Sequence, residues 1–155
     1  MYIVPLNNMK DNSQTAIKSI CVFVHTGKTL ASKGVDEKKG ETFYRGIGGS
    51  VHFRETSEVA MRREIKEELG CDVENLELLT VAENIFTYDG EDRHQIVFLY
   101  KADLTNKDLY KQDKIHIVEP YSEFDAEWVP IDDILSGKAI LYPSLDWSEV
   151  FNKLK

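Results

Sequence analysis

Residues 48–70 read GGSVHFRETSEVAMRREIKEELG and contain five glutamates beside four arginines or lysines. Thr56 or Ser57 can cap the start of a helix, and Gly70 is suited to end it. The stretch is therefore predicted to form a glycine turn, a loop and a charged helix. Its charges admit two interpretations: a solvated helix face with ion pairs, or a group of carboxylates that binds a cation.

Helical geometry separates these charges by face. At about 100° per residue, the carboxylates of Glu64, Glu67 and Glu68 share one face beside an apolar stripe. Arg62 and Lys66 project away from this face and cannot neutralise it. Like charges at such spacings repel by about 0.2–0.5 kcal/mol per pair on an exposed helix. Grouped carboxylates suit a hard divalent cation, but spacing alone supports the cation site and the solvated face about equally.

Several residues of this stretch stand at the offsets of a known signature. The pattern G-x5-E-x7-R-E-I-x-E-E-x-G is formed by Gly49, Glu55, Arg63, Glu64, Ile65, Glu67, Glu68 and Gly70. It closely resembles the Nudix box of the Nudix (MutT-like) hydrolases, and a chance match has a probability on the order of one in a million. The similarity extends over residues 17–140 and includes the segments ICVFV, YRGIGG and EWVPIDDI.

Three positions depart from the family's pattern. Cys71 stands at the final aliphatic position and is expected to pack as a small apolar group. Arg54 stands where many members carry glycine, and His52 where many carry an acid. None of the three removes a metal ligand, but Arg54 and His52 alter the charge and the shape of the loop.

The resemblance implies both a fold and a reaction. Residues 1–155 are expected to form a single Nudix domain, an α/β/α sandwich with a mixed β-sheet and a loop-helix-loop box. The implied activity is hydrolysis of the pyrophosphate linkage in a nucleoside diphosphate joined to another group X, by water that Mg²⁺ or Mn²⁺ activates. Such a cation neutralises the pyrophosphate oxygens and acidifies a bound water, which is why the chemistry needs carboxylates.

Metal-binding roles follow residue by residue from the same resemblance. Glu64, Glu67 and Glu68 are expected to bind the metal, and Glu67 can instead orient or deprotonate the water. Glu55 is a further acid near the metal, and the carbonyl group of Gly49 can complete the coordination shell.

Other charged residues have different expected roles. Arg63 is grouped with the catalytic glutamates because it is expected to pair with one of them and hold the box in register. Glu58 is expected to take no part in the chemistry. The general base is left open between Glu67 in the box and three acids beyond it, Glu119, Glu123 and Glu127.

Substrate contacts are expected from residues outside the box. Tyr44 and Arg45 precede the glycine turn, and Arg45 can meet a phosphate. Phe86 and Tyr88 can stack on a base, although aromatic residues in strands more often belong to the core. Tyr88 lies seventeen residues after Cys71, near a position where a tyrosine accompanies dinucleoside polyphosphate substrates in some Nudix members.

Composition limits the remaining classes of function. The chain has 155 residues, 42% of them hydrophobic, and a formal net charge of −8, so it can bury one core but lacks the basic balance of a protein that wraps nucleic acid. Cys21 and Cys71 form no CxxC pair, and neither a signal peptide nor a membrane-spanning apolar run is evident. We expect a soluble, cytoplasmic protein that binds a small nucleotide derivative, with a homodimer left open.

Pattern reading places the other elements more coarsely. Strands are predicted over 17–24, 43–49, 76–87, 94–102, 115–118 and 124–130. Residues 33–41 are predicted to be a loop, 132–136 a helix and 144–155 a terminal helix.

Two further hypotheses stay open beside an active hydrolase. The first is a Nudix-fold module that binds or senses a nucleotide without hydrolysing it. Such modules commonly lose one or more box glutamates, whereas this sequence retains them. The second is a structural domain with a charged helix, which would show no stabilisation by a divalent metal.

Overall fold

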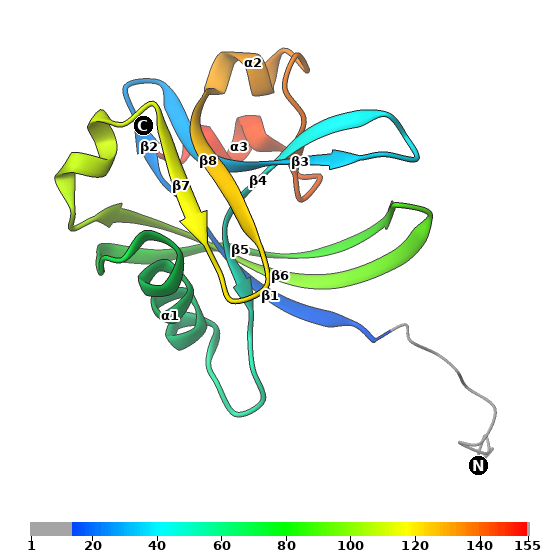
Figure 1. Ribbon diagram of the computed structural model, residues 1–155, viewed down its shortest axis with the longest axis horizontal. Coiled ribbons are helices and arrows are strands. Elements are labelled where there is room, and N and C mark those ends of the chain that lie inside the picture. Colours follow the sequence, from blue (N-terminus) through cyan, green and yellow to red (C-terminus); the bar gives the residue numbers. More distant parts are fainter. Residues whose placement is uncertain (1–13, 155) are drawn as a thin grey trace.

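The computed structural model describes residues 14–154 (Figure 1). In chain order the elements are β1 (Ala16–Val22), β2 (Val24–His25), β3 (Lys28–Asp36), β4 (Glu41–Ser50), α1 (Ser57–Leu69), β5 (Val73–Tyr88), β6 (Glu91–Leu104), the 3₁₀ helix η2 (Lys107–Lys111), β7 (Lys114–Val118), β8 (Glu123–Pro130), α2 (Ile131–Leu135), β9 (Leu141–Tyr142) and α3 (Trp147–Asn152). No helix within this range is long and apolar enough to cross a membrane. The expected lack of a signal peptide concerns the N-terminal segment, whose residues 1–13 lie outside the described part.

A mixed sheet carries the fold, with the strand order β5-β6-β1-β4-β3-β8-β7. Strands β1 and β6 are parallel, whereas the other neighbours in this order are antiparallel. Strand β4 is shared between two parts of the sheet, because residues 41–46 pair with β3 and residues 47–50 pair with β1. The hairpins β3–β4 and β5–β6 consequently extend together from the body of the molecule (Figure 1).

Alternating side chains along the strands build an apolar core on each face of the sheet. Cys21 and Leu30 point into the core that Met61 and Ile65 of α1 complete. The opposite core is covered by α2 and α3 and includes Val22, Ala31, Val129, Ile134, Trp147, Val150 and Phe151. Figure 1 shows α1 apart from α2 and α3, so the expected α/β/α layering is confirmed.

Helix α1 begins and ends where the sequence predicts. The side chain of Thr56 accepts a hydrogen bond from the backbone N–H of Val59 at 3.2 Å, and Gly70 ends the helix with φ 67°. In the preceding loop, Arg54 also has φ 67°. Glycine adopts this left-handed conformation without steric cost, so the arginine at this position occupies a backbone shape suited to the glycine that many relatives carry.

The predicted strands are confirmed, but most of them extend further than their apolar patterns indicate. The prediction of a loop over 33–41 is wrong, because residues 33–36 continue β3 and pair with 41–44 of β4. Only residues 37–40 form the turn. The sequence here is polar, and backbone pairing with an adjacent strand overrides that local pattern. The terminal helix is also shorter than the predicted range 144–155, since α3 covers only Trp147–Asn152.

Asp36 joins the tips of the two long hairpins. Its side chain is 2% exposed and accepts hydrogen bonds from the backbone N–H groups of Lys39 at 2.9 Å and Asp89 at 3.1 Å. The Lys39 ammonium group donates to the carbonyl oxygen of Thr87 on the second hairpin. The hydrogen bond from the Lys39 amide is the main cause that lowers the pKa of Asp36, and the one from Asp89 adds to it.

Replacing Asp36 with Asn should lower the thermal unfolding temperature at neutral pH and not in acid. The folded-state pKa lies below the unfolded value, so the ionised carboxylate stabilises the fold above the unfolded pKa, and this contribution is lost as pH falls through the folded pKa. Thermal unfolding at several pH values measures the difference between wild type and D36N. Asp113→Asn, at an exposed aspartate, is the control. A deficit that is the same at every pH would contradict this role.

Candidate metal centre and substrate cleft

The glycine turn at the end of β4 lets helix α1 approach the sheet closely. A Cβ atom on Gly49 would lie 2.3 Å from Cδ of Glu64, and one on Gly48 would lie 2.1 Å from the carbonyl oxygen of Ser19. Gly48 also has φ 148°, which other residues rarely adopt. Only glycine therefore fits at position 48, whereas a side chain at position 49 would displace the Glu64 carboxyl group, so the pair sets how near the glutamates of α1 come to the backbone of β4.

The Arg63 guanidinium ties the loop to the helix. Its Nε and Nη2 atoms donate to the two carboxylate oxygens of Glu55 at 2.8 and 2.9 Å. Nη1 donates to Glu64 at 2.8 Å and to Glu67 at 3.3 Å, and Nη2 also reaches the Ser50 carbonyl at 2.9 Å. The hydrogen bond from Arg63 is the main cause that lowers the pKa of Glu55 to about 2. Bidentate pairing of this kind fixes orientation, so Arg63 is placed to position the loop and the helix.

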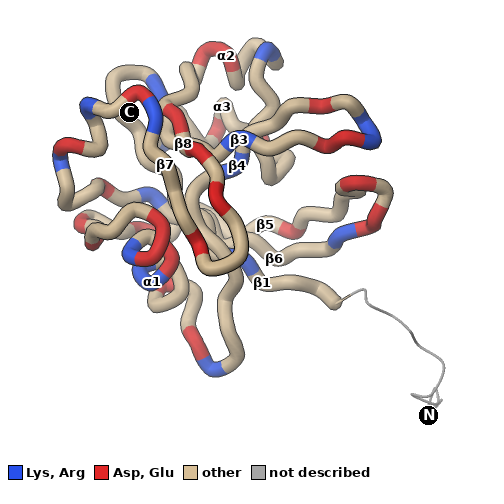
Figure 2. Tube along the Cα trace, in the orientation of Figure 1, with Lys and Arg blue, Asp and Glu red and all other residues tan. Residues whose placement is uncertain are grey.

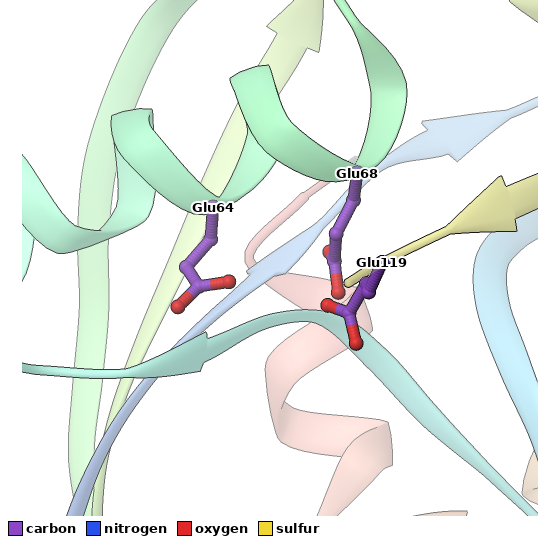
Figure 3. Close-up of side chains that lie close together, drawn as sticks. All are labelled: Glu64, Glu68 and Glu119. Atoms are coloured by element: carbon purple, nitrogen blue, oxygen red, sulfur yellow. The ribbon is translucent and has the colours of Figure 1, made fainter. Parts of the chain in front are cut away.

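Three carboxylates meet beside this turn. Glu64 and Glu68 project from one side of α1, and Glu119 comes from the loop after β7 (Figure 3). One oxygen atom from each lies within 4.8 Å of the others. Burial is the main cause that raises the pKa of Glu68 to about 8, and the charges of Glu64 and Glu119 contribute. Within residues 14–154, the buried Oε2 atom of Glu68 has no hydrogen-bond partner.

This arrangement fits a divalent cation. A buried carboxylate oxygen without a partner costs free energy, and two neighbouring carboxylates add repulsion. A cation among the three groups would supply the missing partner and offset the repulsion. Carboxylate oxygens are ligands that suit Mg²⁺ and Mn²⁺. The donor set and the unpartnered oxygen of Glu68 therefore support a metal site in this cluster.

The carboxylates lie in a cleft of about 1010 Å³ that also contains basic side chains. The Nζ atom of Lys18 donates to Oγ of Ser50 at 2.8 Å, and Nε of Arg45 donates to Oγ of Ser32 at 3.1 Å. Burial is the main cause that lowers the pKa of Lys18, and the positive charges of Arg45 and Arg93 add to it. An anion bound between these cations would relieve that repulsion.

Aromatic rings line the part of the cleft that lies along the two hairpins. Phe86 of β5 stacks on Tyr142 of β9 with ring centroids 6.3 Å apart. Phe43 of β4 meets Tyr142 edge-on at 5.4 Å and Tyr88 at 5.9 Å. The cleft therefore combines carboxylates, cations and rings, which suits a ligand with phosphates and a planar group.

Comparison with known proteins identifies the family to which these features belong. Residues 16–147 match the NUDIX domain. This chain belongs to the NUDIX domain family. A MutT NUDIX hydrolase from Burkholderia pseudomallei is 26% identical to it, with a TM-score of 0.58 over 77% of this chain and 86% of that one.

Two further solved structures share the fold. A NUDIX hydrolase from Nitrosomonas europaea is 15% identical, with a TM-score of 0.62 over 90% of this chain and 88% of that one. A MutT protein from Bacillus halodurans is 19% identical, with a TM-score of 0.59 over 85% of this chain and 78% of that one. At these identities the two structures support the fold alone. The family match and the Burkholderia structure confirm the expected superfamily and the class as a Nudix pyrophosphohydrolase. All three structures confirm the fold.

The Nudix box glutamates occupy different surroundings. The Glu64 side chain is 9% exposed, whereas that of Glu67 is 56% exposed and contacts Arg63. Glu67 lies outside the cluster of Glu64, Glu68 and Glu119, so its metal-binding role remains a prediction. Glu55 also lies outside the cluster, where it accepts from Arg63 and from the backbone N–H of His52 at 3.0 Å.

The functional residues predicted outside the Nudix box also differ in their surroundings. Among the acids left open for the general base, Glu119 joins the cluster, Glu123 pairs with His116, and Glu127 accepts from the Tyr44 hydroxyl at 2.7 Å. Tyr44 is not among the cleft residues, and burial is the main cause that raises its pKa to about 12. The other predicted substrate contacts, Arg45, Phe86 and Tyr88, do line the cleft.

Sequence reasoning missed Lys18 and Tyr142 of this Nudix cleft. The signal for Lys18 was present, because it is the only charged residue in the strand AIKSICV and strand alternation places it away from the α1 core. Tyr142 belongs to a two-residue strand that pairs with β4 from far along the chain. No local pattern indicates such a pairing.

Replacing Glu68 with Gln should stabilise the metal-free protein at high pH. The folded-state pKa of about 8 lies above the ordinary value of 4.5. Between these values the folded protein keeps a proton that the unfolded chain loses, so stability falls as pH rises through this window. E68Q should be the more stable protein above pH 8, by on the order of a few kcal/mol, with little difference below pH 4.

Denaturant unfolding with a chelator, at several pH values, measures this difference. Glu58→Gln is the control, because Glu58 lies on the same helix and pairs at the surface with Arg62 at 3.0 Å. Identical pH profiles for wild type and E68Q would show that Glu68 ionises normally in the folded state.

Proposed function

We propose that this Nudix protein hydrolyses the pyrophosphate linkage of a nucleoside diphosphate derivative with Mg²⁺ or Mn²⁺. The observation that carries the proposal is the cluster of Glu64, Glu68 and Glu119, with its unpartnered Glu68 oxygen, in a cleft that also holds cations and aromatic rings. Such a cleft suits a small nucleotide derivative. Acidic and basic residues are interspersed along the trace of residues 14–154 (Figure 2), whereas proteins that bind large nucleic acids cluster basic residues on one face.

The cluster would hold the metal, and the turn would complete its surroundings. Glu64, Glu68 and Glu119 would supply carboxylate oxygens, and the carbonyl group of Gly49, a residue that packs against the Glu64 carboxyl group, would complete the coordination shell. When bound, the cation neutralises pyrophosphate oxygens and acidifies a water. Arg63 keeps Glu64 in place through its hydrogen bond of 2.8 Å.

Lys18 and Arg45 would bind the phosphate oxygens that face away from the cluster. Both line the cleft, and hydrogen bonds to Ser50 and Ser32 orient their charged groups. Phosphoryl transfer depends mainly on positioning and on stabilising negative charge. Cations that are already held in place supply both without reorganisation during the reaction.

The proton of the attacking water needs an acceptor outside the metal ligands. Glu67 is the candidate, because it precedes Glu68 on α1, contacts Arg63 at 3.3 Å and remains 56% exposed. Glu119 is assigned to the metal, since its carboxylate lies within the cluster. This division leaves each carboxylate with one role.

A nucleotide-binding module without activity is the second candidate function. The same cleft would serve it, but such a module does not require the box glutamates. Their retention favours hydrolysis.

Replacing a cluster glutamate should remove both metal binding and turnover. We expect Glu64→Gln and Glu68→Gln to lower kcat by at least about 100-fold, because each removes a charge that holds the cation. They should also abolish the rise in thermal unfolding temperature that Mg²⁺ or Mn²⁺ gives the wild type. Glu58→Gln, on the same helix, should change neither quantity. A panel of nucleoside diphosphate derivatives measures turnover, and wild-type protein that releases no product from any of them would contradict the proposed activity.

The roles of Glu67 and Glu119 are separable by kinetics. Glu67→Gln should lower kcat by about 10²–10⁴-fold with little change in metal affinity, and should remove the acidic limb of the pH–rate profile. Glu119→Gln should instead raise the metal concentration needed for half-maximal activity. The opposite pattern would exchange the two assignments.

A further inference from the structure

Asn84 is a buried polar residue that faces the cleft. It is 6% exposed and lies on β5 two residues before Phe86, so both side chains share a face of that strand. The neighbouring Ile85 points away and is 71% exposed. Within residues 14–154, no side-chain hydrogen bond involves the Asn84 amide. The amide lines the cleft, so a ligand bound there can supply its hydrogen-bond partners.

A second amide lies directly across the hairpin. Gln95 of β6 is paired with Asn84 and lines the same cleft. The next strand places Ala16 opposite Gln95, and its small side chain leaves space beside the amides. Two amides on adjacent strands offer both hydrogen-bond donors and acceptors in one plane of the sheet.

The pairing of the strands sets the distance between the two amides and the glycine turn beside the proposed metal site. Along β1, Ile20 is opposite Gly48 of the glycine turn, Lys18 is opposite Ser50, and Ala16 is opposite Gln95. Four residues of strand therefore separate the turn from the amides, roughly 13 Å at about 3.3 Å per residue. The Lys18 ammonium group lies between them. This order matches a ligand with phosphates at one end and a polar planar group at the other.

Aromatic rings flank the place where that planar group would lie. Phe86 extends from β5 beside Asn84, and its ring stacks with Tyr142 at 6.3 Å. Rings bind the face of a nucleobase, whereas amides bind its edge. A phosphate would need neither an apolar ring nor two neutral amides.

We propose that Asn84 and Gln95 recognise the base of the substrate, and that this base is adenine. The inference rests on the proposed function, because it assigns the nucleoside end of the same cleft. A side-chain amide donates one hydrogen bond and accepts another, which complements N7 and N6 of adenine. The same edge of guanine offers two acceptors and suits a guanidinium. The guanidinium nearest in sequence, that of Arg93, is paired with Glu91.

Binding of nucleoside monophosphates without divalent metal tests this assignment. Titration calorimetry with AMP, GMP, CMP and UMP, and with ribose 5-phosphate as the probe that lacks a base, should rank AMP tightest. Asn84→Leu should weaken AMP binding about 10-fold or more, towards the affinity for ribose 5-phosphate. Gln95→Leu should act in the same direction. Glu83→Ala, on the opposite face of β5, is the matched control and should leave the ranking unchanged.

Asn84→Asp changes the hydrogen-bonding groups of this residue without changing the shape of its side chain. It replaces the donor that would face N7 of adenine with a second acceptor, so the affinity for AMP should fall towards that for ribose 5-phosphate. A wild-type protein that binds AMP no better than ribose 5-phosphate, or a base ranking that Asn84→Asp and Asn84→Leu leave unchanged, would overturn the inference. A wild type that prefers another base would also overturn it.

The outcome is independent of turnover. AMP selectivity that depends on Asn84, in a protein without hydrolytic activity, would leave the base site standing and remove the proposed reaction. Hydrolysis at equal rates for derivatives of all four bases would support the proposed reaction and contradict the proposed base site.

Discussion

Three carboxylates held within 4.8 Å of one another in a partly buried site repel each other, and much of this structure is arranged to keep them there. Glu64 and Glu68 are four residues apart on α1, so the helix itself places them side by side. Arg63 pairs with Glu64 at the edge of the group and with Glu55 outside it, and within residues 14–154 Oε2 of Glu68 is left without a partner. Repulsion among the carboxylates therefore remains in the metal-free protein, and binding of a cation would relieve it.

Keeping that cluster requires a sheet that can come close to the helix. Strand β4 meets the requirement by carrying no side chains at Gly48 and Gly49, where the carboxylates approach. The same strand changes partner from β3 to β1 just before this point. As a result, one strand both forms the wall of the metal site and directs a long hairpin away from it. The geometry of the cleft follows from this single strand.

Local sequence features predicted the helix and its caps, because these depend on residues within one or two turns, and the resemblance to the Nudix box predicted the pairing of Arg63 with a glutamate. A helical projection did not separate Glu67 from Glu68. Both lie near Glu64 on the projection, and only the position of the sheet decides which one is buried. The sequence did not distinguish Glu119 from Glu123 and Glu127, because the position of Glu119 in the fold depends on where β7 ends. The polar strand residues 33–36 and the ring of Tyr142 likewise depend on pairing with β4, which no local pattern contains.

The metal site and the hairpins differ in what holds them. Glu64, Glu68 and Gly49 are fixed by α1 and the centre of the sheet, so changes there affect the chemistry directly. The residues that line the far part of the cleft stand on two hairpins, which Asp36 joins at their tips. Side chains on these hairpins can change without moving the carboxylates, because the strands that carry them extend beyond the shared core. Differences in substrate among proteins with the same box should therefore arise from β5 and β6. The unusual Arg54 and His52 lie in the loop before α1, where His52 lines the cleft and Arg54 does not, so this loop is a less suitable place than β5 and β6 for a base to be recognised.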